Sequence, residues 1–98
     1  MSDFNEIINS DKPTLVDFFA TWCGPCKVMN PVIEDTKSKL GEEAKVLKVD
    51  VDNNREAAMK YGVRGVPTFI IFKNGEPVWK QSGVISSDVL VQKVREFA

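Results

Sequence analysis

Cys23 and Cys26 are the residues whose type and spacing point most directly to chemistry, because they form a Cys-x-x-Cys site. An apolar, strand-like run precedes the pair and a helical pattern follows it, so the pair is expected at a strand-to-helix junction. Cysteines with this spacing in the first turn of a helix lie on one face, with Cα atoms near the separation that a disulfide tolerates. The sequence therefore predicts a cysteine pair that can open and close reversibly.

The two thiols are expected to have different roles. Cys23 falls at or just before the helix start, where unpaired backbone N–H groups and the positive end of the helix dipole favour the thiolate, so we assign it as the nucleophile. Cys26 lies one turn further in and is expected to be more shielded, which suits a resolving thiol that attacks a mixed disulfide at Cys23. Between them, Gly24 lets a partner's backbone approach closely, and Pro25 suits an early helical position.

Three other interpretations of the pair stay open: a structural disulfide, half of a metal site, and two unrelated buried thiols. A bridge over so short a loop removes little entropy from the unfolded chain. A zinc site needs about four ligands. The chain has two cysteines and no histidine, so a metal site would have to be shared between chains. The setting favours a redox pair with no metal and no bound cofactor.

Asp17 interrupts residues 14–20, which are otherwise almost all apolar or β-branched. Such a run is typical of a central parallel strand that is covered on both faces. Because the neighbouring residues are too apolar for an exposed face, we expect the carboxyl group to be buried, the alternative being a strand-end aspartate turned to water. Lys48, taken alone, would be interpreted as a solvated lysine on a strand over residues 46–51.

The cysteine segment, residues 16–27, resembles the active site of the thioredoxin family, and residues 63–68, residues 72–75 and Gly83 resemble the family's later landmarks. Phe19 departs from the pattern, because many thioredoxins carry a tryptophan there. The resemblance covers nearly the whole chain. It implies an α/β fold, a three-layer α/β/α sandwich with a mixed four-stranded sheet that lacks the family's usual N-terminal strand. The second strand would lie at one edge, followed by the first, third and fourth.

The resemblance also implies roles for residues outside the pair. Asp17 matches an aspartate that lies behind the resolving cysteine and transfers its proton, and Lys48 matches a nearby lysine that would tune Asp17. The Val66–Pro67 bond is expected to be cis and to face the cysteines, with the Val66 backbone ready to pair with an extended substrate segment. The substrate-binding residues implied are Trp22, Gly24, Pro25, Val66, Pro67, Gly83 and Val84.

Apolar periodicity and turn residues predict the remaining elements. These are an N-terminal helix capped by Ser2 or Asp3, a long helix from the cysteine segment to Leu40, a strand over residues 46–51, a helix over residues 55–61, a hairpin of residues 68–72 and 78–82 around Asn74-Gly75, and a last helix capped by Ser86 or Ser87. The helical positions expected to pack inward include Phe4, Ile7, Ile8, Val28, Met29, Val32, Ile33, Thr36, Leu40, Ala58, Met59, Tyr61, Val89, Leu90, Val94 and Phe97.

Length and composition indicate one compact domain over residues 1–98, with 43% hydrophobic and 28% charged residues and a formal charge of −1. This balance carries no signature of nucleic-acid or membrane binding, so partners are expected to be proteins. The N-terminal residues are neither basic nor strongly apolar, so a signal peptide or membrane span is not expected, and the cytoplasm is the expected compartment.

The sequence thus predicts a thiol–disulfide oxidoreductase that reduces disulfide-containing client proteins and is restored by a thioredoxin reductase, acting as a monomer. A thiol oxidant or isomerase of the same fold is the first alternative. It is disfavoured because Gly24 and Pro25 add neither cation nor dipole to stabilise the thiolate further. The second alternative is a binding subunit that uses the fold as a docking face, with incidental thiols. Replacing both cysteines by serine would abolish a reductase and spare a docking role.

Overall fold

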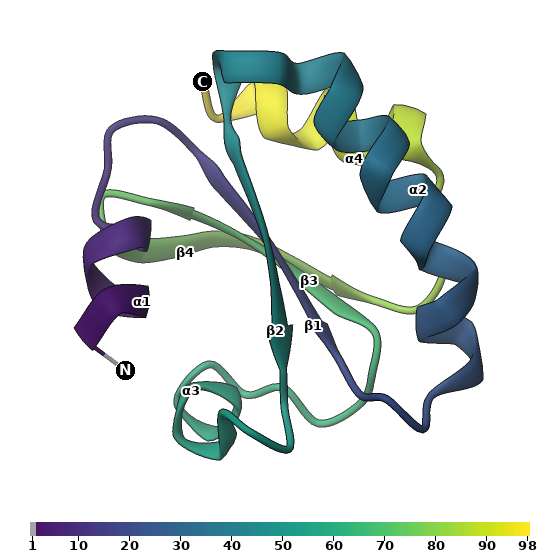
Figure 1. Cartoon of the computed structure of the whole chain (residues 1–98). Helices are drawn as coiled ribbons and strands as arrows, with labels where there is room; N and C mark the ends of the chain where they lie inside the picture. The colour runs from purple at the N-terminus through teal and green to yellow at the C-terminus, as the bar shows by residue number, and fades with distance from the viewer. Residues whose placement is uncertain (1) are drawn as a thin grey trace.

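The structure, a computed structural model, describes residues 2–98 as a mixed sheet covered by helices on both faces (Figure 1). The elements in chain order are α1 (Ser2–Ile8), β1 (Thr14–Phe19), α2 (Gly24–Leu40), a short 3-10 turn η1 (Gly41–Glu43), β2 (Lys45–Asp50), α3 (Arg55–Lys60), β3 (Thr68–Lys73), β4 (Glu76–Ser82) and α4 (Ser87–Glu96). Every element predicted from the sequence is present, with small differences at the ends of the strands and helices.

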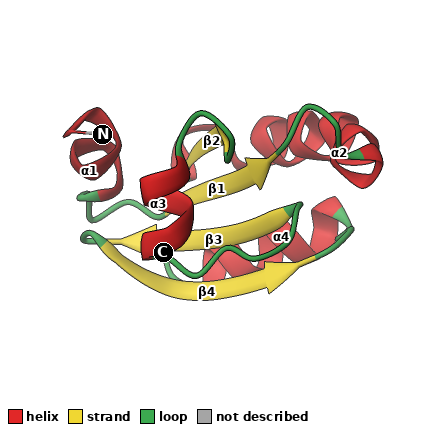
Figure 2. Ribbon diagram, turned by 90° about the horizontal axis from the view of Figure 1, so that it is seen from below, coloured by secondary structure: helices red, strands yellow, loops and turns green. Residues whose placement is uncertain are grey.

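Within the described residues, the sheet has four strands in the order β2-β1-β3-β4. β1 pairs with β2 in parallel and with β3 in antiparallel, and β3 pairs with β4 in antiparallel. Figure 2 shows the opposite directions of β1 and β3. The strand order and the mixed sheet agree with the expected three-layer fold. Because β1 has a neighbour on each side and helices above and below, its residues Leu15, Val16 and Phe18 are fully buried.

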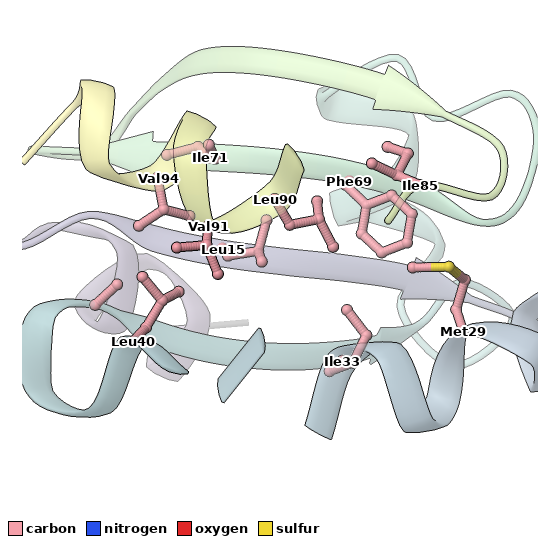
Figure 3. Close-up of a cluster of buried hydrophobic side chains, with 11 residues drawn as sticks. Leu15, Met29, Ile33, Leu40, Phe69, Ile71, Ile85, Leu90, Val91 and Val94 are labelled. Atoms are coloured by element: carbon pink, nitrogen blue, oxygen red, sulfur yellow. The ribbon is translucent and has the colours of Figure 1, made fainter. Parts of the chain in front are cut away.

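Helices α2 and α4 cover one face of the sheet (Figure 1). Their apolar stripes meet the side chains of β1 and β3 on that face, as Figure 3 shows for Met29, Ile33 and Leu90 against Leu15 and Phe69. Trp79 of β4 packs in part against this cluster. This cluster anchors the long helix that carries the cysteines.

Helices α1 and α3 cover the opposite face of the sheet. Phe4 and Ile8 of α1 pack against residues such as Phe18, and the ring of Phe4 meets the ring of Phe72 edge-on at a centroid distance of 5.7 Å. Ala57 of α3 joins the same cluster. The two clusters together enclose the sheet between two helical layers, and they fix β1 between them.

Three residues that the sequence predicted to face inward are exposed instead. Val28 on α2, Met59 on α3 and Val89 on α4 are 58%, 81% and 37% exposed. Each stands next to a buried residue, and a step of one residue turns the side chain about 100° around a helix. On α3 the buried positions include Ala57, and on α4 they include Val91. A run of adjacent apolar residues therefore indicated the helices correctly without determining which of them face the sheet.

The N-terminal end of α4 carries one of its two predicted caps. Ser86 caps α4, because its hydroxyl oxygen accepts a hydrogen bond from the backbone N–H of Val89 at 3.3 Å. The predicted caps of α1, Ser2 and Asp3, have side chains outside the described part. No helix within residues 2–98 combines the length and the apolar character needed to cross a membrane.

Candidate active site

The cysteine pair lies where β1 leads into α2. Cys23 is the N-cap residue of α2, and its backbone N–H donates to the carbonyl oxygen of Ala20 at 3.2 Å, which tightens the turn out of the strand. Cys23 and Cys26 form a disulfide with Cα atoms 5.3 Å apart. The backbone N–H of Cys26 points at Sγ of Cys23 at a distance of 3.1 Å. A backbone donor at a helix N-terminus favours negative charge on that sulfur when the disulfide is opened.

The expected difference in exposure between the two cysteines is absent from the described, oxidised state. Cys23 and Cys26 are each 4% exposed, so the prediction that Cys26 is the more shielded one is wrong here. Both pack against Ala20, and the neighbouring Val66 also covers the pair. The cysteines differ in their position relative to the helix start, and not in exposed fraction.

The Val66–Pro67 peptide bond is cis and faces the pair, as the resemblance implied. Sγ of Cys23 lies 3.6 Å from the carbonyl oxygen of Val66. The loop after β4 reaches the same place, because the backbone N–H of Gly83 donates to the carbonyl oxygen of Pro67 at 2.9 Å. Gly83 has φ +97°, which an L side chain rarely adopts, and the next residue, Val84, is 58% exposed. The structure thus brings together the predicted docking residues from three loops.

Trp22 stands beside the pair and is 71% exposed. Its indole Nε1–H donates to Oδ2 of Asp52 at 2.9 Å, which fixes the ring against the segment that follows β2. A groove of about 120 Å³, here called the Trp22 groove, runs along it and is lined by Trp22, Val51, Val63, Arg64, Gly65 and Val66. Gly24 and Pro25 are exposed at the first turn of α2, and no atom of the described chain lies within 4 Å of the Cβ position at Gly24. A partner can therefore approach there.

Asp17 is buried in the middle of β1, as predicted, with 1% of its surface exposed. Within residues 2–98 neither of its carboxylate oxygens has a hydrogen-bond partner. Burial raises the pKa of Asp17 to about 6, and the positive charge of Lys48 partly opposes this rise. A carboxyl group with such a pKa can both accept and release a proton near neutral pH.

Lys48 is the register partner of Asp17 on the neighbouring strand β2. Its Nζ donates to Oδ1 of Asn30 at 2.6 Å and lies 4.6 Å from the centre of the Phe19 ring. A cavity of about 210 Å³, here called the Lys48 cavity, is lined by Phe19, Ala20, Thr21, Cys26, Lys27, Asn30 and Lys48. The structure therefore joins Lys48 to Asp17 through the sheet and to Cys26 through the cavity, while no hydrogen bond within residues 2–98 links Asp17 to either cysteine.

Two contacts of the site were not predicted from the sequence. Asp52, the partner of Trp22, lies 30 residues away along the chain, and no local pattern connects the two. Asn30 stands four residues after Cys26, on the same face of α2, and this helical spacing was a signal that could have marked it.

Comparison with known proteins agrees with this geometry. The family model Thioredoxin matches residues 1–96. The chain is 43% identical over 94 residues to thioredoxin Y, chloroplastic, of Oryza sativa subsp. japonica, which covers 95% of this chain and 56% of that protein. It is 40% identical over 97 residues to a thioredoxin-like protein of Synechocystis, covering 98% of this chain and 92% of that one.

The chain belongs to the thioredoxin family. A solved structure, a thioredoxin mutant from Halobacterium salinarum NRC-1, has a TM-score of 0.88 and 36% identity, covering 99% of this chain and 84% of that one. The chain spans little more than half the length of the rice relative.

This chain thus combines membership of the thioredoxin family with a cysteine pair at disulfide distance. Within the described residues, no three side chains of His, Cys, Asp or Glu gather into a group that could hold a metal ion. The Cys23–Cys26 disulfide and the family membership identify the site as a redox-active centre.

Proposed function

We propose that this chain reduces disulfide bonds of client proteins and that a separate thioredoxin reductase returns it to the dithiol form. The observation that carries the proposal is the disulfide between Cys23 and Cys26 at the first turn of α2, with the backbone N–H of Cys26 directed at Sγ of Cys23. This donor and the helix N-terminus stabilise a thiolate on Cys23 and so favour its attack on a disulfide.

The reaction proceeds by two exchanges. The Cys23 thiolate attacks one sulfur of the client disulfide, a bond forms between Cys23 and the client, and the other client sulfur leaves as a thiolate that takes up a proton. Cys26 then loses its proton and attacks Sγ of Cys23, which releases the second client thiolate and forms the Cys23–Cys26 disulfide. Two electrons pass from the cysteine pair to the client, and two protons accompany them.

Asp17 accepts the proton that Cys26 releases, through a bridging water. Its burial and its pKa of about 6 support this role, because a carboxyl group with such a pKa is largely ionised near neutral pH yet still basic enough to take a proton. Lys48 supports the ionised form through its positive charge. Asp17 and Lys48 thus have different roles: Asp17 holds the proton, and Lys48 lowers the free-energy cost of the buried anion.

Client segments bind in an extended conformation beside the cysteines. The backbone of Val66, next to Pro67, offers a partner for strand-like pairing, and the surrounding residues Trp22 and Val84 are largely exposed apolar side chains. Gly24 and Gly83 leave room for close approach of a backbone. Recognition by backbone pairing suits a broad range of client proteins.

This domain works as a monomer in the cytoplasm, in line with its having no cysteines beyond the active pair. Lys45, Lys48 and Asp50 place charges on the edge strand β2, and charges on an edge discourage pairing with another chain.

Insulin reduction tests the proposal. The dithiol protein, kept reduced by excess dithiothreitol, is expected to accelerate the cleavage of insulin disulfides over dithiothreitol alone. Equilibration of the pair with a glutathione buffer separates reductant from oxidant. The cysteine pair of a reductant is already oxidised at ratios of reduced to oxidised glutathione at which the pair of an oxidant is still reduced. Absence of insulin cleavage by the dithiol form, with the disulfide shown to be open, would contradict the proposal.

A further inference from the structure

Asn30 makes a close polar contact with Lys48 across two layers of the fold. It lies on α2, one turn after Cys26, and its side-chain Oδ1 accepts a hydrogen bond from Nζ of Lys48 on β2 at 2.6 Å. Hydrogen bonds from a charged donor are shorter and stronger than neutral ones. Asn30 and Lys48 are both exposed, so neither side chain needs the other for burial. The contact therefore ties the end of a flexible lysine to helix α2.

Phe19, which follows Asp17 by two residues on β1, makes the second contact to the same ammonium. Nζ of Lys48 lies 4.6 Å from the ring centre, a distance at which the ring face attracts a cation. An exposed lysine has a flexible stem and a strongly hydrated head, so without contacts it samples many positions in solvent. Two contacts from two different elements hold this one in a defined position.

The position matters because of what surrounds it. Lys48 is the register partner of Asp17, and it lines the Lys48 cavity together with Cys26. The titratable groups that line the Lys48 cavity are Lys48 from β2 and Cys26 and Lys27 from α2, while the β3 register partner of Asp17 is the apolar Phe69. Lys48 forms no ion pair with Asp17 within 4 Å. Its influence on the carboxylate therefore depends on where the ammonium is held.

We propose that Asn30 is a positioning residue that holds the Lys48 ammonium at the Lys48 cavity, where its charge favours the ionised form of Asp17. The electrostatic part of this proposal stands on the contacts above. Its consequence for catalysis, that Asn30 sets the pH at which Asp17 accepts the proton of Cys26, rests on the proposed function.

Loss of the Asn30 side chain should release Lys48 toward solvent. Movement in the other direction, toward the buried carboxylate, would take the ammonium out of water, and the desolvation cost of a buried ion pair can exceed its Coulombic gain. With the cation further away, its opposition to the burial effect weakens. The pKa of Asp17 should therefore rise when Asn30 is removed.

The decisive experiment is a carboxyl ¹³C NMR titration of Asp17 in the oxidised protein, where the disulfide prevents the cysteines from titrating. Asp17→Asn assigns the resonance. Asn30→Ala is expected to raise the pKa of Asp17 by about half a pH unit, from the weaker Coulomb interaction of a more distant cation. Alanine suits a helix, so the variant is expected to fold. Ser38→Ala, an exposed polar residue on the same helix, is the matched control and should leave the titration unchanged.

A double-mutant cycle shows whether Asn30 acts through Lys48. Lys48→Met keeps an apolar stem without the charge and should raise the pKa of Asp17 at least as much as Asn30→Ala does. In the Lys48→Met background, Asn30→Ala should then have no further effect. An unchanged or lowered pKa in Asn30→Ala, or a rise that persists in the Lys48→Met background, would overturn the proposal.

The pH profile of insulin reduction provides the catalytic arm. The limb that reports Asp17 should move to higher pH in Asn30→Ala by the shift that NMR measures. If the wild-type protein does not reduce insulin, the proposed function fails, while the titration of the oxidised protein still decides the positioning role. A normal pH profile together with a shifted titration would restrict the role of Asn30 to electrostatics and overturn its part in proton transfer.

Discussion

The charged groups near the two ends of helix α2 differ in burial and in partners. At its N-terminal end lie the cysteine pair and the buried Asp17, whose oxygens have no hydrogen-bond partner within residues 2–98. At its C-terminal end, charges pair with α4 and with each other: Nζ of Lys39 lies 2.9 Å from Asp35 and 3.1 Å from Asp88. Further along the same side, Arg95 of α4 donates two hydrogen bonds to Glu43, each 3.0 Å long.

The pKa values follow this division. The pKa of Asp35 is lowered by a hydrogen bond from the hydroxyl of Ser87 and, to a smaller extent, by one from Lys39. The hydrogen bonds from Arg95 lower the pKa of Glu43. At the other end, burial raises the pKa of Asp17 to about 6. Carboxylates in solvent with partners thus stay ionised, whereas the buried one without a partner is poised near neutrality. The comparison distinguishes the paired surface carboxylates, which stay ionised, from the buried carboxyl group of Asp17, which can take part in proton transfer.

The volume of a groove or cavity does not identify the end of α2 that carries the cysteine pair. A groove of about 660 Å³ lies between α2 and α4 and is lined by Lys39, Asp88, Val91, Gln92, Arg95 and Glu96. Each charged residue of that lining has an ion partner within the chain. The Lys48 cavity and the Trp22 groove are smaller, yet they adjoin the cysteine pair. The buried carboxyl group without a partner and the cysteine pair therefore distinguish the active end better than the volume of a groove does.

The largest expected effect comes from the cysteines. Cys23→Ser and Cys26→Ser should each reduce insulin turnover by at least about a thousandfold, because each removes one sulfur of the exchange. Cys26→Ser should accumulate mixed disulfides through Cys23, since the second attack is lost, and Cys23→Ser should not. Non-reducing gels and mass spectrometry of the adducts measure this. Adducts through Cys26 in the Cys23→Ser protein, at the level of the reciprocal variant, would reverse the two roles.

Asp17→Asn is the second test, because it removes the poised charge while nearly keeping the shape. The raised folded-state pKa means that the acid's stabilising contribution is complete below the unfolded value near 3.8 and is lost as pH rises through about 6. The variant should therefore gain about 2 to 3 kcal/mol in unfolding free energy over the wild type at pH 8, and little at pH 3.5.

Urea denaturation from acidic to alkaline pH measures the stability effect of Asp17→Asn. Insulin reduction near neutral pH should slow by roughly tenfold or more, because the proton acceptor is gone. Parallel pH dependence of stability in the variant and the wild type would show that Asp17 is not the buried group that titrates.

A smaller effect is expected at Asp52, which orients Trp22 beside the cysteine pair. Asp52→Ala removes the acceptor of the indole N–H, and the KM for insulin should rise by about two- to fivefold with kcat little changed. Glu56→Ala on α3 removes an exposed negative charge and is the matched control. An equal rise in KM for both variants would attribute the effect to net charge and not to the Trp22 contact.

The smallest effect is expected at the paired end. Arg95→Ala breaks the exposed contact with Glu43, and such contacts are worth little because water and salt screen them. The denaturation midpoint should fall slightly in low salt, with no difference from wild type in high salt or at a pH low enough to protonate Glu43, whose lowered pKa makes its contribution disappear as pH falls. Insulin reduction should be unchanged. A marked loss of activity would contradict the separation of the two ends.

Local sequence determined much of this protein. The strand-to-helix junction at Cys23 and the burial of Asp17 were predicted from residue types within a few positions. The same local pattern limited the cap of α4 to Ser86 or Ser87, and the structure places it at Ser86. The cis bond before Pro67 was different, since only the family resemblance indicated it.

Tertiary structure decided which side chains meet. Lys48 contacts Asn30, and Trp22 contacts Asp52, only because the sheet and helices bring together segments 18 and 30 residues apart. The same reason explains why Val28 is exposed while its neighbour Met29 is fully buried: the pattern of residues makes the helix, but the sheet beneath it selects the face that packs. Contacts between segments distant in the chain carry no local signal, because their free energy depends on a geometry that exists only in the folded state.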